Sequence, residues 1–243
     1  MKSCVSKGNL WWFQGQQFPA AVFSRPCLQH CAVALLAICL MFATSALAGP
    51  PLICHSIAIG NAQSLPWTSQ DWNLSGTETY DVKKLVGDTL AILNPTTPVL
   101  VRMETLRRAT LYAQKDPQVA RELLTKLQAR SSAAETAGHP DALAFFDAGY
   151  LAEAYKQWLG KENPATGVDG YASVKKAIAL RGQDPQMEFA AALMTSKDEH
   201  REHVLRAAAG AKPDPLLAQN LAKRFPDDPT VAEMFGKTNA AKK

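Results

Sequence analysis

The stretch LAFFDAGYLAEAYKQW, residues 143–158, decides the fold class. Its apolar side chains recur with the 3.6-residue period of a helix and form one face: Leu143, Phe146, Tyr150, Ala154 and Trp158. The other side, with Leu151 and Tyr155, is apolar as well. Because a helix that is apolar all round is usually buried, we expect this helix at the centre of a helical domain.

Four Asp-Pro steps mark helix starts elsewhere in the chain: Asp116-Pro117, Asp184-Pro185, Asp214-Pro215 and Asp228-Pro229. An N-cap aspartate accepts hydrogen bonds from the first amides of a helix, and a proline directly after it has no N–H to leave unpaired. Pro98 and Pro140 mark two further starts.

Between these marks the apolar residues follow the helical period, and no segment reads as a strand. We expect one helix over residues 99–114, and each later mark is followed by a further apolar stripe. Short helices joined by short linkers favour stacked antiparallel hairpins. The sequence therefore predicts an all-α fold, a tetratricopeptide-like α-solenoid, over residues 79–243.

Leu151-Ala152-x-x-Tyr155 resembles the first helix of a tetratricopeptide repeat. Gly170, Val174, Ala177 and Pro185 resemble its second helix and closing proline. The 68 residues from Pro117 to Pro185 are twice the 34-residue period of that family. The resemblance covers about one repeat and implies a surface that binds peptides or proteins.

The match has departures. The linker at 159–169 is longer than in the family, and Arg181-Gly182 is inserted before the closing proline. The later Asp-Pro steps are 30 and 14 residues apart. An irregular helical bundle, with Asp-Pro steps serving only as caps, remains the alternative.

Residues 1–48 have the pattern of an export signal. The 17-residue run AVALLAICLMFATSALA at 32–48 has no charge, follows a segment whose only charged residues are basic, and ends in small-x-small. A membrane span usually needs about 20 apolar residues. We expect cleavage near Ala48 and a periplasmic or extracellular protein. An uncleaved N-terminal anchor is the alternative.

Removing residues 1–48 changes the charge. The whole chain has 26 basic and 22 acidic residues, and this segment holds three of the basic ones and no acidic ones. The remaining chain carries 23 against 22, a net charge of +1. A near-neutral chain without a basic cluster gives no sign of nucleic-acid binding, or of membrane contact beyond the export signal.

Residues 49–78 are interrupted by prolines, glycines and polar turn residues but keep several apolar side chains, so we expect an extended, irregular segment that packs across the helices. Its string from Cys54 to Trp67, CHSIAIGNAQSLPW, resembles one in uncharacterised exported bacterial proteins. That resemblance implies a bacterial source and no particular activity.

Cys54-His55 is a candidate binding pair. Cys54 is the only cysteine after cleavage, so the cleaved chain has no internal disulfide, and a disulfide-linked dimer through Cys54 is one expectation. An anchoring role for a half-buried cysteine is the second, and a metal or redox role is the third. Haem attachment needs Cys-x-x-Cys-His, and residue 51 is proline.

Other candidates for chemistry lie on predicted helices. His200 and His203 share a helix face at i and i+3, which could hold a metal, but a solvated, charged face is the default interpretation and no metal or cofactor is expected. Asp147 and Glu153 are the best acid or base candidates. Glycine-rich phosphate loops and the GxSxG elbow are absent from the sequence.

The sequence therefore favours a non-catalytic module that binds a protein or peptide through a face lined by Tyr150, Tyr155 and Trp158, with Cys54 and His55 as further contacts. The alternative is an exported helical hydrolase of cell-wall or polysaccharide material that uses Glu153 or Asp147.

Overall fold

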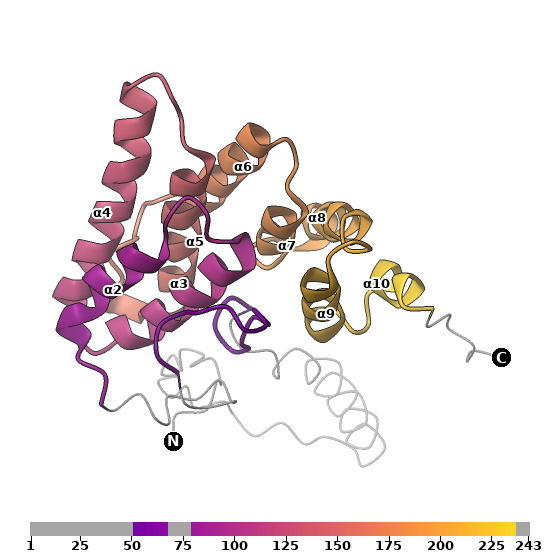
Figure 1. Ribbon diagram of the computed structural model, residues 1–243, viewed down its shortest axis with the longest axis horizontal. Coiled ribbons are helices and arrows are strands. Elements are labelled where there is room, and N and C mark those ends of the chain that lie inside the picture. The colour runs from indigo at the N-terminus through magenta and orange to yellow at the C-terminus, as the bar shows by residue number, and fades with distance from the viewer. Residues whose placement is uncertain (1–50, 68–78, 237–243) are drawn as a thin grey trace, which may run out of the picture. The chain divides into compact units, whose positions relative to one another are not determined.

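A computed structural model describes residues 51–67 and 79–236 (Figure 1). These described residues belong to one compact unit. The predicted export signal at 1–48 lies outside the described residues.

The described residues are all-α, as predicted, with nine α-helices, two short 3-10 helices and no strand. The elements are η1 (Val82–Lys84), α2 (Leu85–Ile92), α3 (Val99–Ala113), α4 (Pro117–Thr136), α5 (Ala142–Trp158), η2 (Gly160–Glu162), α6 (Gly170–Arg181), α7 (Pro185–Ala192), α8 (Lys197–Ala209), α9 (Pro215–Arg224) and α10 (Pro229–Met234). Within this part of the chain, no helix is long and apolar enough to cross a membrane.

All four Asp-Pro steps begin helices, which confirms the prediction from capping. They start α4, α7, α9 and α10, and each aspartate accepts from amides of the first turn at 2.9–3.3 Å. Pro98 directly precedes α3. Near Pro140 the cap is Asp141, whose carboxylate accepts from Leu143 and Ala144, so α5 begins at Ala142.

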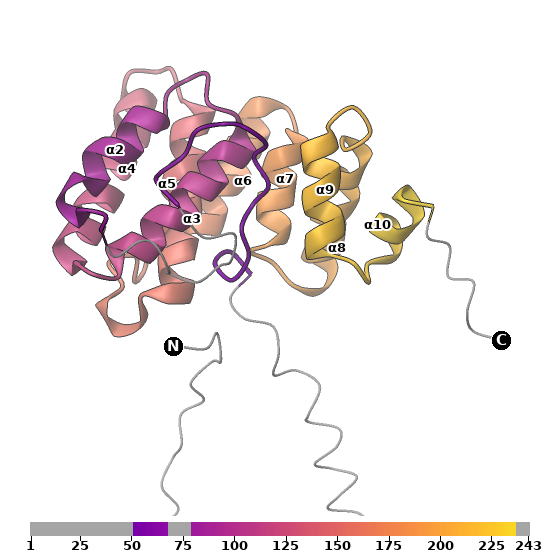
Figure 2. The ribbon, with the colours of Figure 1, turned by 60° about the horizontal axis from the view of Figure 1, so that its bottom comes forward.

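Helix α5 is the centre of the core, and α3, α4 and α6 all pack against it (Figures 1 and 2). The α5–α6 crossing is close because Gly149 faces Gly170. A Cβ atom on Gly149 would lie 2.5 Å from the carbonyl oxygen of Gly170, so a side chain at this position would push the helices apart. Helices α7 and α8 form the next closely packed pair.

The helix pairs do not follow a 34-residue period. Helices α5 and α7, which open successive pairs, begin at Ala142 and Pro185, 43 residues apart. The 68-residue interval from Pro117 to Pro185 contains three α-helices, whereas two tetratricopeptide repeats would contain four. The repeated pairs are compatible with a helical-repeat domain of longer unit.

Candidate functional site

Residues 51–67 contain no helix or strand and cross the face of α3 toward α9 (Figure 2). Leu52, Ile53, Ile57 and Leu65 are buried there and belong to the main core. We call 51–67 the N-terminal segment. Its apolar side chains supply the hydrophobic part of the docking.

The backbone of the N-terminal segment is held by side chains of the helical body. Asn220 on α9 contacts Ala58 twice: its Oδ1 accepts from the amide at 2.8 Å, and its Nδ2 donates to the carbonyl at 2.9 Å. We define the docking face as the side chains that contact this backbone: Glu104, Arg107, Arg108, Tyr112, Gln157, Asn220 and Arg224.

The other contacts of the docking face also involve main-chain atoms. Gln157 accepts from the Leu52 amide at 3.0 Å. Four carbonyls accept hydrogen bonds from arginines: Pro51 and His55 from Arg224, Ile53 from Arg107, and Leu65 from Arg108. The Tyr112 hydroxyl donates to the Pro66 carbonyl. These side chains supply hydrogen-bond partners that a sheet or helix would otherwise provide.

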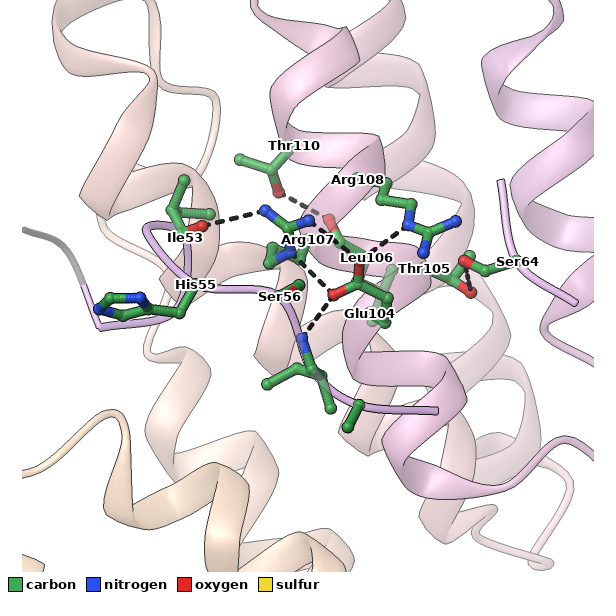
Figure 3. A network of polar contacts seen from close by, with 12 residues as sticks. Ile53, His55, Ser56, Ser64, Glu104, Thr105, Leu106, Arg107, Arg108 and Thr110 are labelled. Carbon is green, nitrogen blue, oxygen red and sulfur yellow. Dashed lines mark hydrogen bonds and ion pairs between the residues drawn. The ribbon is translucent and has the colours of Figure 1, made fainter. Parts of the chain in front are cut away.

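At the centre of the docking face, Glu104 is fully buried and accepts four hydrogen bonds (Figure 3). The donors are the Ile57 amide, two guanidinium nitrogens of Arg107 and one of Arg108, at 2.8–2.9 Å. Burial alone would raise the pKa of Glu104, but the hydrogen bonds and charges of these partners outweigh it and lower the pKa. Glu104 is therefore an ionised carboxylate that joins the segment to α3.

Cys54 and His55 lie at one end of the N-terminal segment. Cys54 is 4% exposed and disulfide-bonded. The His55 side chain is exposed, and its pKa is lowered by partial burial and by the charges of Arg224 and Lys223. The two side chains therefore differ in environment, and His55 is the accessible member of the pair.

The aromatic residues predicted to line a binding face lie mostly in the core. Tyr150 and Tyr155 are fully buried, and neither hydroxyl has a hydrogen-bond partner. They cannot touch a partner, because α5 is covered by α3, α4 and α6. Trp158, at the end of α5, is partly exposed and donates to Gln114 at 3.0 Å.

The two carboxylates proposed for hydrolysis have structural contacts. Asp147 is fully buried and pairs with Arg102 at 2.5 Å. Burial raises its pKa to about 7, although Arg102 opposes the shift. Glu153 accepts from the first amides of α6, at Gly170 and Tyr171. Neither carboxylate lines either of the two surface pockets described below.

The two histidines of α8 do not converge. His200 contacts the Ala192 carbonyl through Nδ1 and packs edge-on against Phe225. His203 instead faces Glu188 on α7 and Tyr171 on α6. In residues 51–67 and 79–236, no three His, Cys, Asp or Glu side chains gather as metal ligands.

A surface pocket of about 370 Å³ lies between α6, α7 and α8 and contains this His203 contact. Glu188, His203 and Tyr171 form a chain from a buried carboxylate to a partly exposed phenol. In the sequence, His203 stands out only as a partner of His200, and no local signal marks Glu188 or Tyr171. A second pocket, of about 470 Å³, is lined by the starts of α3, α7 and α9 and includes Pro98, Pro185 and Asp214.

No protein-family model matches the chain, and no curated protein or solved structure matches it either. The contacts described above are therefore the basis for assigning a function.

Proposed function

We propose that the helical body is an interaction module that binds an extended polypeptide segment through its backbone. The observation that carries this proposal is the double contact of Asn220 with the amide and carbonyl of Ala58. A side-chain amide that pairs with both polar groups of one residue recognises an extended chain whatever its side chain is. The arginine and glutamine contacts extend the same mode along the chain.

In this proposal the protein's own N-terminal segment occupies the docking face, and a partner segment of similar chemistry competes for it. Such a segment would be irregular in conformation and would carry apolar side chains at the positions of Ile53 and Ile57. Its affinity would come from apolar burial, and its register from the docking-face side chains. Tethering gives the protein's own segment a high effective concentration, so a partner must bind more tightly or arrive when the segment is released.

A chain cut after folding tests the proposal. Protein beginning at Gly49, with a specific protease site inserted between Trp67 and Tyr80, is purified intact and then cut. A fluorescent synthetic peptide of residues 51–67 is added under reducing conditions, and anisotropy follows its exchange. We expect saturable binding, at least ten-fold weaker for Asn220→Ala. A peptide that never enters the cut protein, or binds both proteins equally, would overturn the proposal.

The position of this module outside the cytosol is part of the proposal. It is supported by the uncharged run at 32–48 and the ALA at 46–48. Sequencing the N-terminus of protein made in a bacterial host with the whole chain should give Gly49.

We also propose that the helix pairs are diverged repeats. Leu151, Ala152 and Tyr155 of α5 are buried, as are Gly170 and the two other α6 residues of the tetratricopeptide-like pattern, Val174 and Ala177. The 43-residue interval between α5 and α7 argues for a unit longer than that of the tetratricopeptide family.

A further inference from the structure

The pocket between α6, α7 and α8 is lined by polar and charged side chains that have no part in the proposed peptide binding. Tyr171 and Lys175 line it from α6, Glu188 from α7, and Glu199, His203 and Arg206 from α8. These side chains are separate from the docking face. They form a site of their own, large enough for a small organic ligand.

Three of these side chains form a hydrogen-bonded chain with defined roles. Glu188 Oε2 lies 2.5 Å from Nδ1 of His203, and Nε2 of His203 lies 2.7 Å from the Tyr171 hydroxyl. An ionised carboxylate only accepts hydrogen bonds, so Nδ1 carries a proton. In the neutral imidazole, Nε2 then accepts, and the Tyr171 hydroxyl donates to it.

The burial of the chain increases from Tyr171 to Glu188. The side chain of Glu188 is 1% exposed and that of His203 is 6% exposed, while Tyr171 is partly open to the pocket. The second carboxylate oxygen, Oε1, is buried without a hydrogen-bond partner. Glu188 therefore directs its hydrogen bonding at His203, apart from a 3.6 Å contact with Arg206. A nucleophile within hydrogen-bonding distance of a base, which is itself oriented by a third group, is the arrangement of a catalytic triad.

Two other charged groups at the pocket, Arg206 and Lys175, have contacts of their own. Arg206 pairs with Glu202 at 2.7 Å, and the Lys175 ammonium lies 4.6 Å from the centre of the Tyr171 ring. Burial, followed by the charges of Glu199 and Glu188, raises the pKa of Tyr171. The resting side chain is therefore a protonated phenol, which needs a base to become nucleophilic.

We propose that Tyr171, His203 and Glu188 form a nucleophilic site that accepts an acyl group from a small carboxylic ester. The Tyr171 oxygen attacks the ester carbonyl carbon while its proton passes to Nε2 of His203. The new carbon–oxygen bond forms, the bond to the leaving alkoxide breaks, and His203 returns the proton to that alkoxide. Water, deprotonated by His203, then attacks the carbonyl carbon of the acyl-tyrosine. The bond from that carbon to the Tyr171 oxygen breaks, the carboxylic acid leaves, and His203 returns the proton to the Tyr171 oxygen. Tyr171 and His203 are catalytic residues, and Glu188 is a positioning residue.

Tyr80 is a matched internal control for this inference. It is also a partly buried tyrosine, but its hydroxyl donates to the carboxylate of Asp88 at 2.7 Å and contacts no imidazole. A carboxylate is a weaker base than an imidazole. Tyr171 therefore has the imidazole base that the proposed attack on an ester requires, and Tyr80 does not.

The experiment treats the full chain with p-nitrophenyl acetate and measures p-nitrophenolate release and the acetylation of each tyrosine by peptide mass mapping. We expect Tyr171 to be acetylated at least ten-fold faster than Tyr80. Tyr171→Phe should abolish the fast release, and His203→Gln should reduce acetylation of Tyr171 to the rate of Tyr80. Glu188→Gln should slow it several-fold and remove the far-downfield Nδ1 proton of His203 from the NMR spectrum.

Equal acetylation of Tyr171 and Tyr80 in the unmodified protein would overturn the inference, and that comparison needs no variant to fold. An unchanged rate in His203→Gln with native circular dichroism would overturn it as well. Loss of the fast rate in Gln219→Ala, at an exposed position of α9 that does not line the pocket, would also contradict a site formed by Tyr171, His203 and Glu188.

Discussion

Two buried glutamates, Glu104 on α3 and Glu188 on α7, have opposite surroundings. Glu104 accepts four hydrogen bonds, so both of its oxygens are satisfied, and it lines neither of the two pockets described above. Glu188 uses one oxygen, mainly toward His203, and lines a pocket. A buried carboxylate whose two oxygens both accept hydrogen bonds therefore joins parts of a fold. A buried carboxylate that has one unpaired oxygen and lies beside a pocket can instead orient a reactive group.

The largest effect is expected from Glu104→Gln. The substitution removes the charge that pairs with Arg107 and Arg108 and leaves the Arg107 charge buried. Breaking a buried ion pair costs about 3–5 kcal/mol, which urea unfolding should detect. The control is Glu122→Gln, which breaks an exposed pair with Lys126 and should cost under about 1 kcal/mol. Similar losses in both variants would remove the structural role assigned to Glu104.

Asp147 and Glu104 should each make the free energy of unfolding depend on pH, in opposite directions. The pKa of Asp147 is raised from 3.8 to about 7, so between these values the folded state holds a proton that the unfolded chain lacks, and the free energy of unfolding falls as pH rises. The pKa of Glu104 is lowered from 4.5, so its contribution is present above that pH and is lost as pH falls through the lowered value.

Urea unfolding from pH 3 to 8 measures both dependences. Asp147→Asn should flatten the decline between about pH 4 and 7, which amounts to a few kcal/mol at about 1.4 kcal/mol per pKa unit. Glu104→Gln should leave that decline in place and weaken the loss in acid. A decline that persists unchanged in Asp147→Asn would show that another group causes it.

Asn220→Ala should cost about 2 kcal/mol. It removes both hydrogen bonds to Ala58 and leaves backbone groups of the N-terminal segment without partners. Amide hydrogen exchange should accelerate in residues 51–67 more than in α5. Gln219→Ala, at an exposed position on the same helix, serves as the control and should change neither stability nor exchange.

Glu188→Gln should have the smallest effect on stability, about 1 kcal/mol, because its carboxylate makes one close hydrogen bond and leaves one oxygen unpaired. Thermal unfolding of this variant beside Glu104→Gln compares the two glutamates directly. Equal destabilisation would mean that Glu188 holds the fold in the same way as Glu104, and the contrast between them would fail.

The helices could be predicted from the sequence because caps and apolar periods are local signals. At Asp184-Pro185, the aspartate carboxylate and the proline ring themselves determine where the helix starts. The docking face could not be predicted, since Glu104 meets Ile57 across 47 residues and Asn220 meets Ala58 across 162 residues. Charges such as Glu104 and Arg107 on a helix usually indicate a solvated face, but here both are buried and contact the N-terminal segment.

The site residues were harder to predict for the same reason. An i, i+3 spacing suggested that His203 would work with His200, but its partners come from α6 and α7, 32 and 15 residues away. Tyr150 and Tyr155 were expected on a binding face. Because α5 is covered on several sides, the same aromatic pattern instead fills the core.

The claim that an extended chain is recognised through its backbone is tested most directly by one modified peptide. The affinity of the cut protein is measured for residues 51–67 with an N-methyl group on Ala58, beside the unmodified peptide and an Ala58→Ser peptide. The methyl group removes the amide proton that Asn220 accepts. We predict at least ten-fold weaker binding for the N-methyl peptide and less than about three-fold change for Ala58→Ser. Equal affinity of the N-methyl and unmodified peptides would contradict the account.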